Sequence, residues 1–332
     1  MRLILLILLT PLLLLGQAPF HYSISIDNQL DTVKLCQGDN TILSSIITST
    51  NNNTASYTVN PIQYQPYNYS GTTVLNNIGN PLIDDQVSIL LPINFTFCFF
   101  GNQYNQCYVG SNGWLGFSPA QSQSFTSQLV PSTNFLVPRN CIMGPWHDLN
   151  PSIASSSCST NPTRNYIRYR TEGVAPYRRF IVSWVNIPMY QCTATCGTQQ
   201  IVIYESTNII ENYIERKVSC GVWAGGTATQ SLHNLAGNIA IPVPGRNSTV
   251  WVATNDAWTW IPISVIPPVI NWFIDNINVS NGNTLSISNW NNGCYNVSVN
   301  AQWSCVSSIF SDNIIVCVKE CCDTNTGPIY TE

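Results

Sequence analysis

Apolar and polar residues alternate with a period of two through the middle of the chain. The clearest segments are NYIRYRTEG (165–173), RRFIVSWVNI (178–187) and TQQIVIYESTNIIENYIE (198–215). Half-buried antiparallel strands give this pattern, because successive side chains point to opposite faces of a sheet. We find no convincing helical pattern longer than ten residues. The alternation therefore predicts an all-β chain.

A hairpin is predicted in DDQVSILLPINFTFCFFGNQYNQCYVGSNGWLGFSP (84–119), and the rest of a sandwich is expected to build on it. We expect strands in VSILLPINFTFCFF and CYVGSNGWLGFS, with a turn at GNQYNQ. Pro92 is tolerated at a strand start or edge, and Asn112-Gly113 permits the positive φ of a tight turn. With the aromatic-rich strands near residue 260, this predicts an antiparallel β-sandwich over residues 81–265.

The flanking segments have weaker patterns. Residues 19–80 are interpreted as an N-terminal strand segment, which packs on the edge of the main domain or forms a vestigial small β module, followed by a surface loop or linker from Asn51 to Asn80. Two prolines in IPPVI (266–270) mark a boundary. Short strands separated by Asn, Gly and Ser turns then predict a small immunoglobulin-like β-sandwich over residues 266–320. Residues 321–332 are expected to form a linker or truncated tail.

Composition supports the β assignment and restricts the partners. Only 8% of the 332 residues are charged, against about 25% in typical domains. Asn, Ser, Thr and Gln supply the polar surface instead, and they suit turns and strands better than helices. The net charge is −4. No basic stripe interleaves with aromatic residues, so nucleic acid is not an expected partner.

The first eighteen residues are predicted to be a signal peptide. Met1-Arg2 is followed by an apolar run from Leu3 to Leu15, interrupted only at Thr10-Pro11, and then by small residues. This run is shorter than the ~20 residues that a membrane span needs. No second long apolar stretch follows, so the mature chain is expected to lack a transmembrane span and to be secreted or held at the cell surface.

The thirteen cysteines of an exported chain are expected to form disulfides rather than a metal site. Their odd number leaves at least one free, or paired outside this sequence. Spacing does not determine the full connectivity. The candidates suggested by local spacing are Cys98 with Cys107 across the hairpin turn, Cys192 with Cys196 across a short loop, and Cys294 with Cys305 or Cys317.

A Ca²⁺ site is the only cofactor site that the sequence suggests. Asp84, Asp85, Asp148 and Asn112 lie in separate predicted turns and offer the oxygen ligands that Ca²⁺ prefers. The chain has no D-x-D-x-D spacing, and Asp or Asn in turns commonly binds its own backbone. A purely structural role therefore remains the alternative. Together with His147 and Asp256, these aspartates form the best candidate cluster of polar residues in the sequence.

Catalytic motifs are absent from the sequence. It contains neither G-x-S-x-G nor H-E-x-x-H. A Ser–His–Asp arrangement stays open because serines are abundant. The carboxylates that could serve a glycoside hydrolase are Asp148, Glu172, Glu205, Glu211 and Glu215. Glu205 and Glu215 sit where strand alternation already places a solvent-facing polar residue, so we expect no enzyme.

Aromatic residues suggest a carbohydrate-binding surface. The chain has ten tryptophans, and aromatic faces stack on sugar rings. Trp184, Trp251 and Trp272 lie on alternating strands and are expected in the core. The ligand-binding candidates near turns are Trp114, Trp146, Trp258 and Trp260, with Asn112.

Several motifs together resemble a nidogen-type domain. That family has an FFG-x-x-Y hairpin, an (S/T)NG turn, a W-x-D motif and a "VLYE" strand followed by an "IE" strand. The matching residues here are Phe99-Phe100-Gly101, Tyr104, Asn112-Gly113, Trp146, Asp148 and Ile203-Tyr204-Glu205. Residues 80–320 are similar to large secreted surface proteins of gliding, type IX-secreting bacteria, in which PKD-like or Ig-like modules follow. The sorting domain of that group is not found.

The resemblance implies adhesion to an extracellular protein or carbohydrate surface and implies no chemistry. We expect a non-catalytic, secreted or cell-surface adhesion module. A structural spacer in a longer stalk is the first alternative, and a secreted polysaccharide hydrolase is the second.

Overall fold

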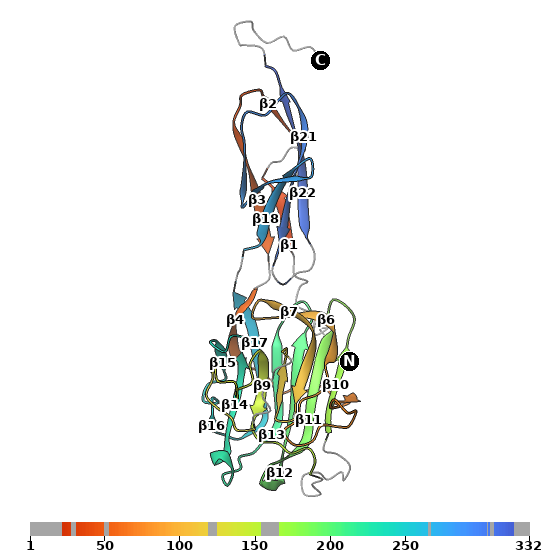
Figure 1. Ribbon diagram of the computed structural model, residues 1–332, viewed down its shortest axis with the longest axis vertical. Helices are drawn as coiled ribbons and strands as arrows, with labels where there is room; N and C mark the ends of the chain where they lie inside the picture. Colours follow the sequence, from red (N-terminus) through yellow and green to blue (C-terminus); the bar gives the residue numbers. More distant parts are fainter. Residues whose placement is uncertain are drawn as a thin grey trace, which may run out of the picture.

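The computed structural model consists of two β-sandwiches arranged end to end (Figure 1). The structure describes residues 22–27, 31–49, 53–118, 125–153, 166–264, 267–303, 305 and 309–321. The predicted signal peptide and residues 322–332 of the tail lie outside these ranges. The all-β prediction is confirmed, and the helical content of the described residues is one 3-10 turn, η1 (Ala224–Gly226). None of their helices has the length and apolar character to cross a membrane.

The larger sandwich spans residues 53–264, and its first sheet contains the strands that alternate most clearly. Neighbouring strands are antiparallel, with the longest ladder between residues 179–189 and 192–204. In sheet order, the strands are β4 (Asn53–Pro61), β17 (Ala253–Ser264), β13 (Ile210–Lys217), β12 (Cys192–Tyr204), β11 (Arg179–Met189), β10 (Tyr166–Glu172) and β5 (Thr72–Thr73).

The second sheet of the larger sandwich contains the predicted hairpin. In sheet order, its strands are β15 (Ala240–Pro242), β14 (Thr227–His233), β9 (Cys141–Trp146), β8 (Trp114–Gly116), β7 (Asn102–Gly110) and β6 (Leu91–Phe99), and β16 (Thr249–Val250) pairs with β14. Apolar side chains of both sheets meet in one core, which includes Phe97, Phe99, Trp184 and Trp260. Burial of this apolar area stabilises the sandwich.

The β6–β7 hairpin is tighter than the sequence suggested. Its turn is Phe100-Gly101, both with positive φ, and β7 starts at Asn102. Two consecutive residues with positive φ form the turn type that matches the twist of a hairpin. The predicted turn at GNQYNQ is therefore wrong except for Gly101, because residues 102–106 already belong to β7. The turn at Ser111-Asn112-Gly113, between β7 and β8, is confirmed.

The smaller sandwich is built from both ends of the chain. One sheet consists of β1 (Tyr22–Ile26), β3 (Thr41–Ser49) and β20 (Thr284–Ile287). The other consists of β19 (Ile277–Asn281), β18 (Val269–Ile274), β21 (Gly293–Gln302), β22 (Phe310–Lys319) and β2 (Thr32–Cys36). Its core surrounds Trp272, with Ile24 and Leu43 from the N-terminal strands. The predicted core position of Trp272 is confirmed.

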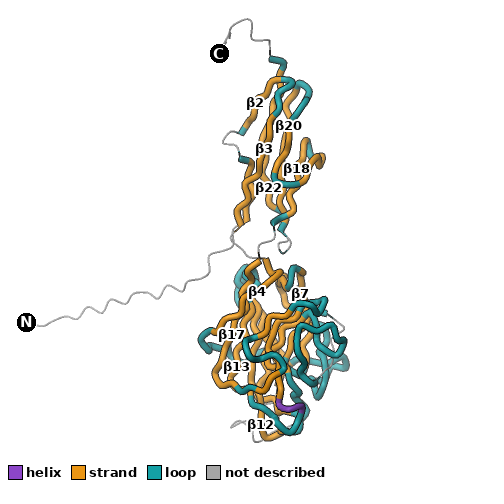
Figure 2. Tube along the Cα trace, turned by 90° about the vertical axis from the view of Figure 1, so that its left-hand side faces the viewer, coloured by secondary structure: helices purple, strands orange, loops and turns teal. Residues whose placement is uncertain are grey.

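The interpretation of residues 19–80 as an edge segment and linker of the main domain is wrong. Strand β2 pairs in parallel with β22, and β3 pairs with β20, so residues 22–49 complete the smaller sandwich. Residues 53–61, which were assigned to the linker, form β4 and pair with β17 of the larger sandwich. The larger sandwich is thus inserted between β3 and β18, and its first and last strands, β4 and β17, pair with each other at the end nearer the smaller sandwich, as Figure 2 shows.

Two of the disulfides between described residues, Cys36–Cys321 and Cys98–Cys305, join segments more than 200 residues apart in the sequence. The bonds between described residues are Cys36–Cys321, Cys98–Cys305, Cys192–Cys220 and Cys294–Cys317. The predicted Cys294–Cys317 bond is confirmed, and its alternative with Cys305 is wrong. Cys192–Cys196 is also wrong, although Cys196 is disulfide-bonded.

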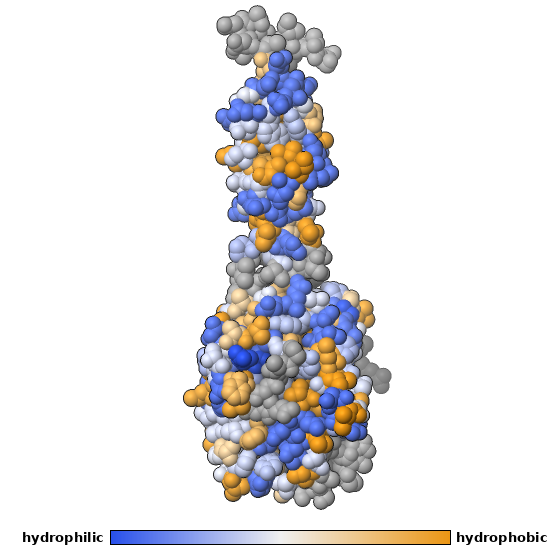
Figure 3. Space-filling model, viewed as in Figure 1, coloured by the Kyte–Doolittle hydropathy of each residue, from blue (hydrophilic) through white to orange (hydrophobic). Residues whose placement is uncertain are grey.

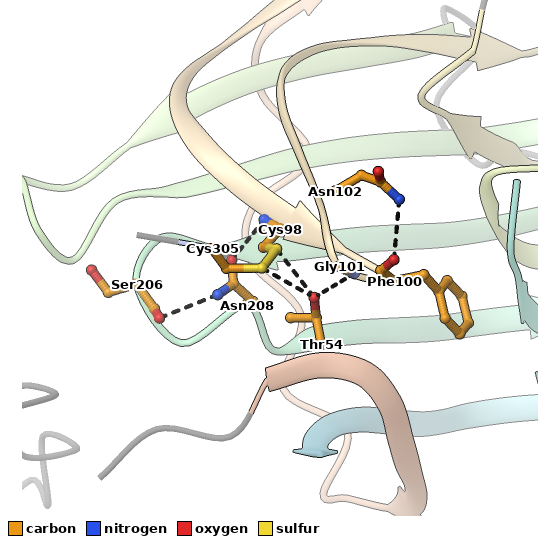
Figure 4. The surroundings of a disulfide bond; sticks show 8 residues. All are labelled: Thr54, Cys98, Phe100, Gly101, Asn102, Ser206, Asn208 and Cys305. Carbon is orange, nitrogen blue, oxygen red and sulfur yellow. Dashed lines mark hydrogen bonds between the residues drawn. A yellow bond between two sulfur atoms is a disulfide. The ribbon is translucent and has the colours of Figure 1, made fainter. Parts of the chain in front are cut away.

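The predicted Cys98–Cys107 bond is wrong because of the tight turn. Cys98 faces Gln103 near the turn, whereas Cys107 faces Leu91 at the far end of the hairpin. Cys107 is a buried free thiol, as is Cys141. Cys98 instead bonds to Cys305 of the smaller sandwich, and the Thr54 hydroxyl lies 3.1 Å from Cys98 Sγ (Figure 4).

Candidate functional site

The three aspartates of the candidate metal site come together in the structure. Asp84 and Asp85 belong to the segment before β6, and Asp148 follows β9. One carboxylate oxygen from each lies within 4.8 Å of the others. The fold achieves this by bringing the segment at residues 86–88 against the β7–β8 turn, where Ser111 N donates to Gln86 O at 2.8 Å.

Asn112 connects the two sides of this acidic cluster. Its Nδ2 donates to Asp85 Oδ1 at 2.8 Å, and its Oδ1 accepts from the Leu149 N–H at 2.8 Å. Both hydrogen bonds hold the amide in one orientation, and the side chain is buried. Asn112 is therefore a positioning residue beneath the aspartates, and the interpretation of this residue as part of an exposed ligand surface is wrong.

Asp148 is the most buried acid of the cluster, at 5% exposure. Trp223 Nε1 donates to its Oδ2 at 2.7 Å. Oδ1 of Asp148 and Oδ1 of Asp84 are both buried, and neither has a hydrogen-bond donor among the described residues. Burial, together with the neighbouring aspartates, raises the pKa of Asp148 to about 7 although the Trp223 hydrogen bond opposes this. Burial and then Asp85 raise the pKa of Asp84.

His147 and Asp256 do not join the acidic cluster. Burial, and then the nearby Lys217 ammonium, lower the pKa of His147 to about 3, so the imidazole is neutral. Asp256 accepts hydrogen bonds from Arg246 and from the Trp258 indole instead. The earlier grouping of these two residues with the aspartates is therefore wrong.

A chain of buried polar side chains connects Asp256 to the β7–β8 turn. Its core members, Gln199, Asn212 and Gln230, are almost fully buried. The successive hydrogen bonds join Asp256 to Arg246, Arg246 to Gln230, Gln230 to Asn212, Asn212 to Gln199, and Gln199 to Gly113 O. Because each buried amide has partners, the chain fixes the turn without leaving these groups unsatisfied.

Three of the four tryptophans proposed as a binding surface belong to the core. Trp114, Trp146 and Trp260 are at most 1% exposed, and Trp258 is half-buried. Trp114 and Trp146 flank turns, but each lies on a strand and packs in the cluster around Met143. The predicted core position of Trp184 is confirmed. The prediction that Trp114, Trp146 and Trp260 form an exposed surface for stacking on sugar rings is therefore wrong.

Each of the glutamates considered for glycoside hydrolysis has its own hydrogen-bond or ion-pair partners. Glu172 binds Arg170 and Arg179, Glu205 binds Arg178, Glu211 accepts from Tyr204 and Tyr213, and Glu215 accepts from Tyr69. The hydrogen bond from Arg178 lowers the pKa of Glu205, although burial opposes this. Each glutamate thus has a structural role, because its contacts hold neighbouring side chains in place on the first sheet.

Exposed apolar side chains gather near Trp223, and sequence reasoning missed them. They are Phe125, Leu129, Val222 and Val250, here called the distal apolar patch, and their exposures range from 41% to 80%. The Phe125 and Trp223 rings lie 6.3 Å apart, Ser127 Oγ lies 2.9 Å from Thr227 Oγ1, and Thr227 pairs with Val250.

Figure 2 places η1, which directly follows Trp223, at the end of the larger sandwich away from the smaller one. The patch joins two loops and the short strand β16, which are distant in the sequence, so no periodic pattern could reveal it.

Comparison with known protein families gives one match. A family model described as NIDO related matches residues 54–262. These bounds coincide closely with the larger sandwich, and they cover more than half of the chain. No curated protein and no solved structure matches significantly.

Proposed function

The chain belongs to the NIDO-related family, and from that premise we propose that it is a non-catalytic adhesion module that binds an extracellular protein. The family and the four disulfides between described residues are consistent with a secreted or cell-surface protein. The signal peptide predicted at residues 1–18 supports the same location.

The distal apolar patch is the observation that carries this proposal. Val222 and Leu129 are 80% and 67% exposed. Val222 directly precedes the half-buried Trp223, and Leu129 lies two residues after Ser127, which contacts Thr227. Exposed apolar residues grouped in loops on a rigid sandwich are a common basis of protein recognition. Figure 3 shows that apolar residues also gather at other places on the visible face, including the middle of the smaller sandwich. The burial of three predicted platform tryptophans favours a protein partner over a carbohydrate.

The proposal is tested with the full chain immobilised and exposed to a panel of extracellular matrix proteins and to a glycan array. We expect saturable binding to at least one protein. Val222→Asp, combined with Leu129→Asp, should weaken this binding at least tenfold, because charges would be buried at an apolar interface. Ile277→Asp is the matched control, since Ile277 is 69% exposed on the smaller sandwich.

Two outcomes would reject the proposal in favour of its alternatives. A structural spacer should show no saturable binding to any component of the panel. A polysaccharide hydrolase should release sugars in a substrate screen, and either His147→Ala or Asp148→Asn should abolish that turnover.

A further inference from the structure

We propose that Asp84, Asp85 and Asp148 bind one Ca²⁺ ion. One oxygen from each carboxylate lies within 4.8 Å of the other two. Ca²⁺ binds oxygen at about 2.3–2.6 Å, so two ligands on opposite sides of one ion are roughly 5 Å apart. The three side chains can therefore contact the same ion. This proposal does not depend on the adhesive function.

The unpartnered oxygen of Asp148 is the second observation. The side chain is 5% exposed, and its Oδ2 is held by the Trp223 indole. Oδ1 has no donor among the residues that the structure describes, and the same holds for Asp84 Oδ1. A buried carboxylate oxygen without a partner is costly, and a cation would satisfy both oxygens at once.

The ligand chemistry favours Ca²⁺ over a transition metal. All three ligands are carboxylates, and neither a cysteine nor a histidine of the described chain joins the cluster. Hard oxygen ligands suit Ca²⁺ or Mg²⁺, and the flexible coordination of Ca²⁺ fits ligands from separate loops better. Asn112 fixes the Asp85 carboxylate from behind, because it also holds the Leu149 N–H.

A bound Ca²⁺ ion would replace the repulsion among the three carboxylates with attraction of each carboxylate to the ion. Without it, three carboxylates repel each other across a short distance. With it, they connect the segment before β6 to the end of β9. Removing one carboxylate should therefore stabilise the metal-free chain and destabilise the chain in Ca²⁺. A merely structural cluster would not show this reversal.

The test uses the full chain treated with EDTA and then titrated with CaCl₂ by isothermal calorimetry, with thermal unfolding measured in EDTA and in Ca²⁺. We expect a single site with a Kd of about 10⁻³ M or tighter, and a higher Tm in Ca²⁺. Asp148→Asn and Asp84→Asn should each weaken binding at least tenfold and remove most of the Tm increase. In EDTA their Tm should equal or exceed that of the unmodified chain.

Asp256→Asn is the matched control, since Asp256 lies in the same sandwich but binds Arg246, and its Ca²⁺ titration should be unchanged. If Asp148→Asn fails to fold, the partly exposed Asp84 provides the test alone. The proposal is overturned if the unmodified chain shows neither saturable heat nor a Tm change. It is equally overturned if the folded Asp84 variant titrates like the unmodified chain.

Discussion

Cys98 and Cys305 are bonded across the boundary between the two sandwiches. Cys98 is at the end of β6 in the inserted domain, and Cys305 lies between β21 and β22 of the smaller one. Asn208 Oδ1 accepts from the Cys98 N–H at 2.8 Å, and the Thr54 hydroxyl donates to Cys98 Sγ (Figure 4). The bond is a third covalent connection beside the two points where the chain crosses, so it limits bending between the sandwiches.

Removing the Cys98–Cys305 bond should allow more bending between the two sandwiches. Cys98→Ser with Cys305→Ser is expected to lower the free energy of unfolding by roughly 2–4 kcal/mol, because a long loop is no longer closed. Small-angle scattering should show a broader distribution of interdomain distances.

The matched control is the removal of Cys192–Cys220, which lies within the larger sandwich. That variant should lose stability while its interdomain distances stay unchanged. An unaltered distribution after loss of Cys98–Cys305 would contradict the role of the bond as an interdomain connection.

Gly144 should not tolerate a side chain. A Cβ at this position would lie 1.8 Å from Gln199 Oε1, and Gln199 cannot move without losing its bonds to Asn212 and Gly113. We expect Gly144→Ala to destabilise the chain by roughly 2–4 kcal/mol, measured by urea unfolding.

Gly197→Ala is the control, because the nearest atom to its Cβ would be 3.6 Å away. Adding Gln199→Ala to the Gly144 variant should cost less than the sum of the two single changes. Strict additivity would show that the two side chains do not compete for the same space.

Protonation of His233 should reduce stability in mildly acidic solution. The fully buried ring donates from Nδ1 to Pro138 O at 2.7 Å, and its Nε2 accepts from the Ser132 N–H at 3.2 Å. The bond from Ser132 needs the neutral ring, because Nε2 can accept only when it carries no proton. Burial lowers the pKa of His233, although the hydrogen bond to Pro138 opposes this. The unfolded chain, with a pKa near 6.5, therefore takes up a proton before the folded chain does, and stability falls as the pH falls below about 6.5.

His233→Leu tests this contribution. The variant should be less stable than the unmodified chain at pH 7.5, and the difference should shrink by about 1 kcal/mol at pH 5.5, since only the unmodified chain loses the His233 contribution. Urea unfolding at both pH values measures it. A difference that is independent of pH would show that His233 does not titrate as described.

The sequence predicted local structure well, because strand alternation is a local property. The ladders of β10 to β13 follow the alternating segments directly. The N-terminal strands were misplaced because pairing between β2 and β22 joins residues more than 280 positions apart, and no local pattern records such a partner. The disulfide errors have the same origin, since Cys98 bonds to a residue 207 positions away rather than to a neighbour.

The candidate site was predicted in part. Asp84, Asp85 and Asp148 were grouped because turns place hard oxygen ligands near one another, and the fold brings them together. The tryptophans were misjudged because proximity to a turn does not decide exposure. Trp114 directly follows the β7–β8 turn, yet it lies against Gly110, where a Cβ would be 2.1 Å from its ring. Only the tertiary packing of three strands buries it.

Cys107 and Cys141, the free thiols among the described residues, should resist alkylation in the folded chain. Cys107 and Cys141 are both fully buried without a disulfide, and burial raises the pKa of each thiol. The thiolate is the reactive form, so both access and ionisation are suppressed. Iodoacetamide at pH 8 is therefore expected to label neither residue until urea is added. Peptide mapping should then find both labelled without reductant, whereas Cys98 requires reduction first. Labelling of Cys107 in the native chain, or its recovery in a disulfide with Cys98, would contradict the hairpin register, because Cys107 must then lie beside the turn instead of opposite Leu91.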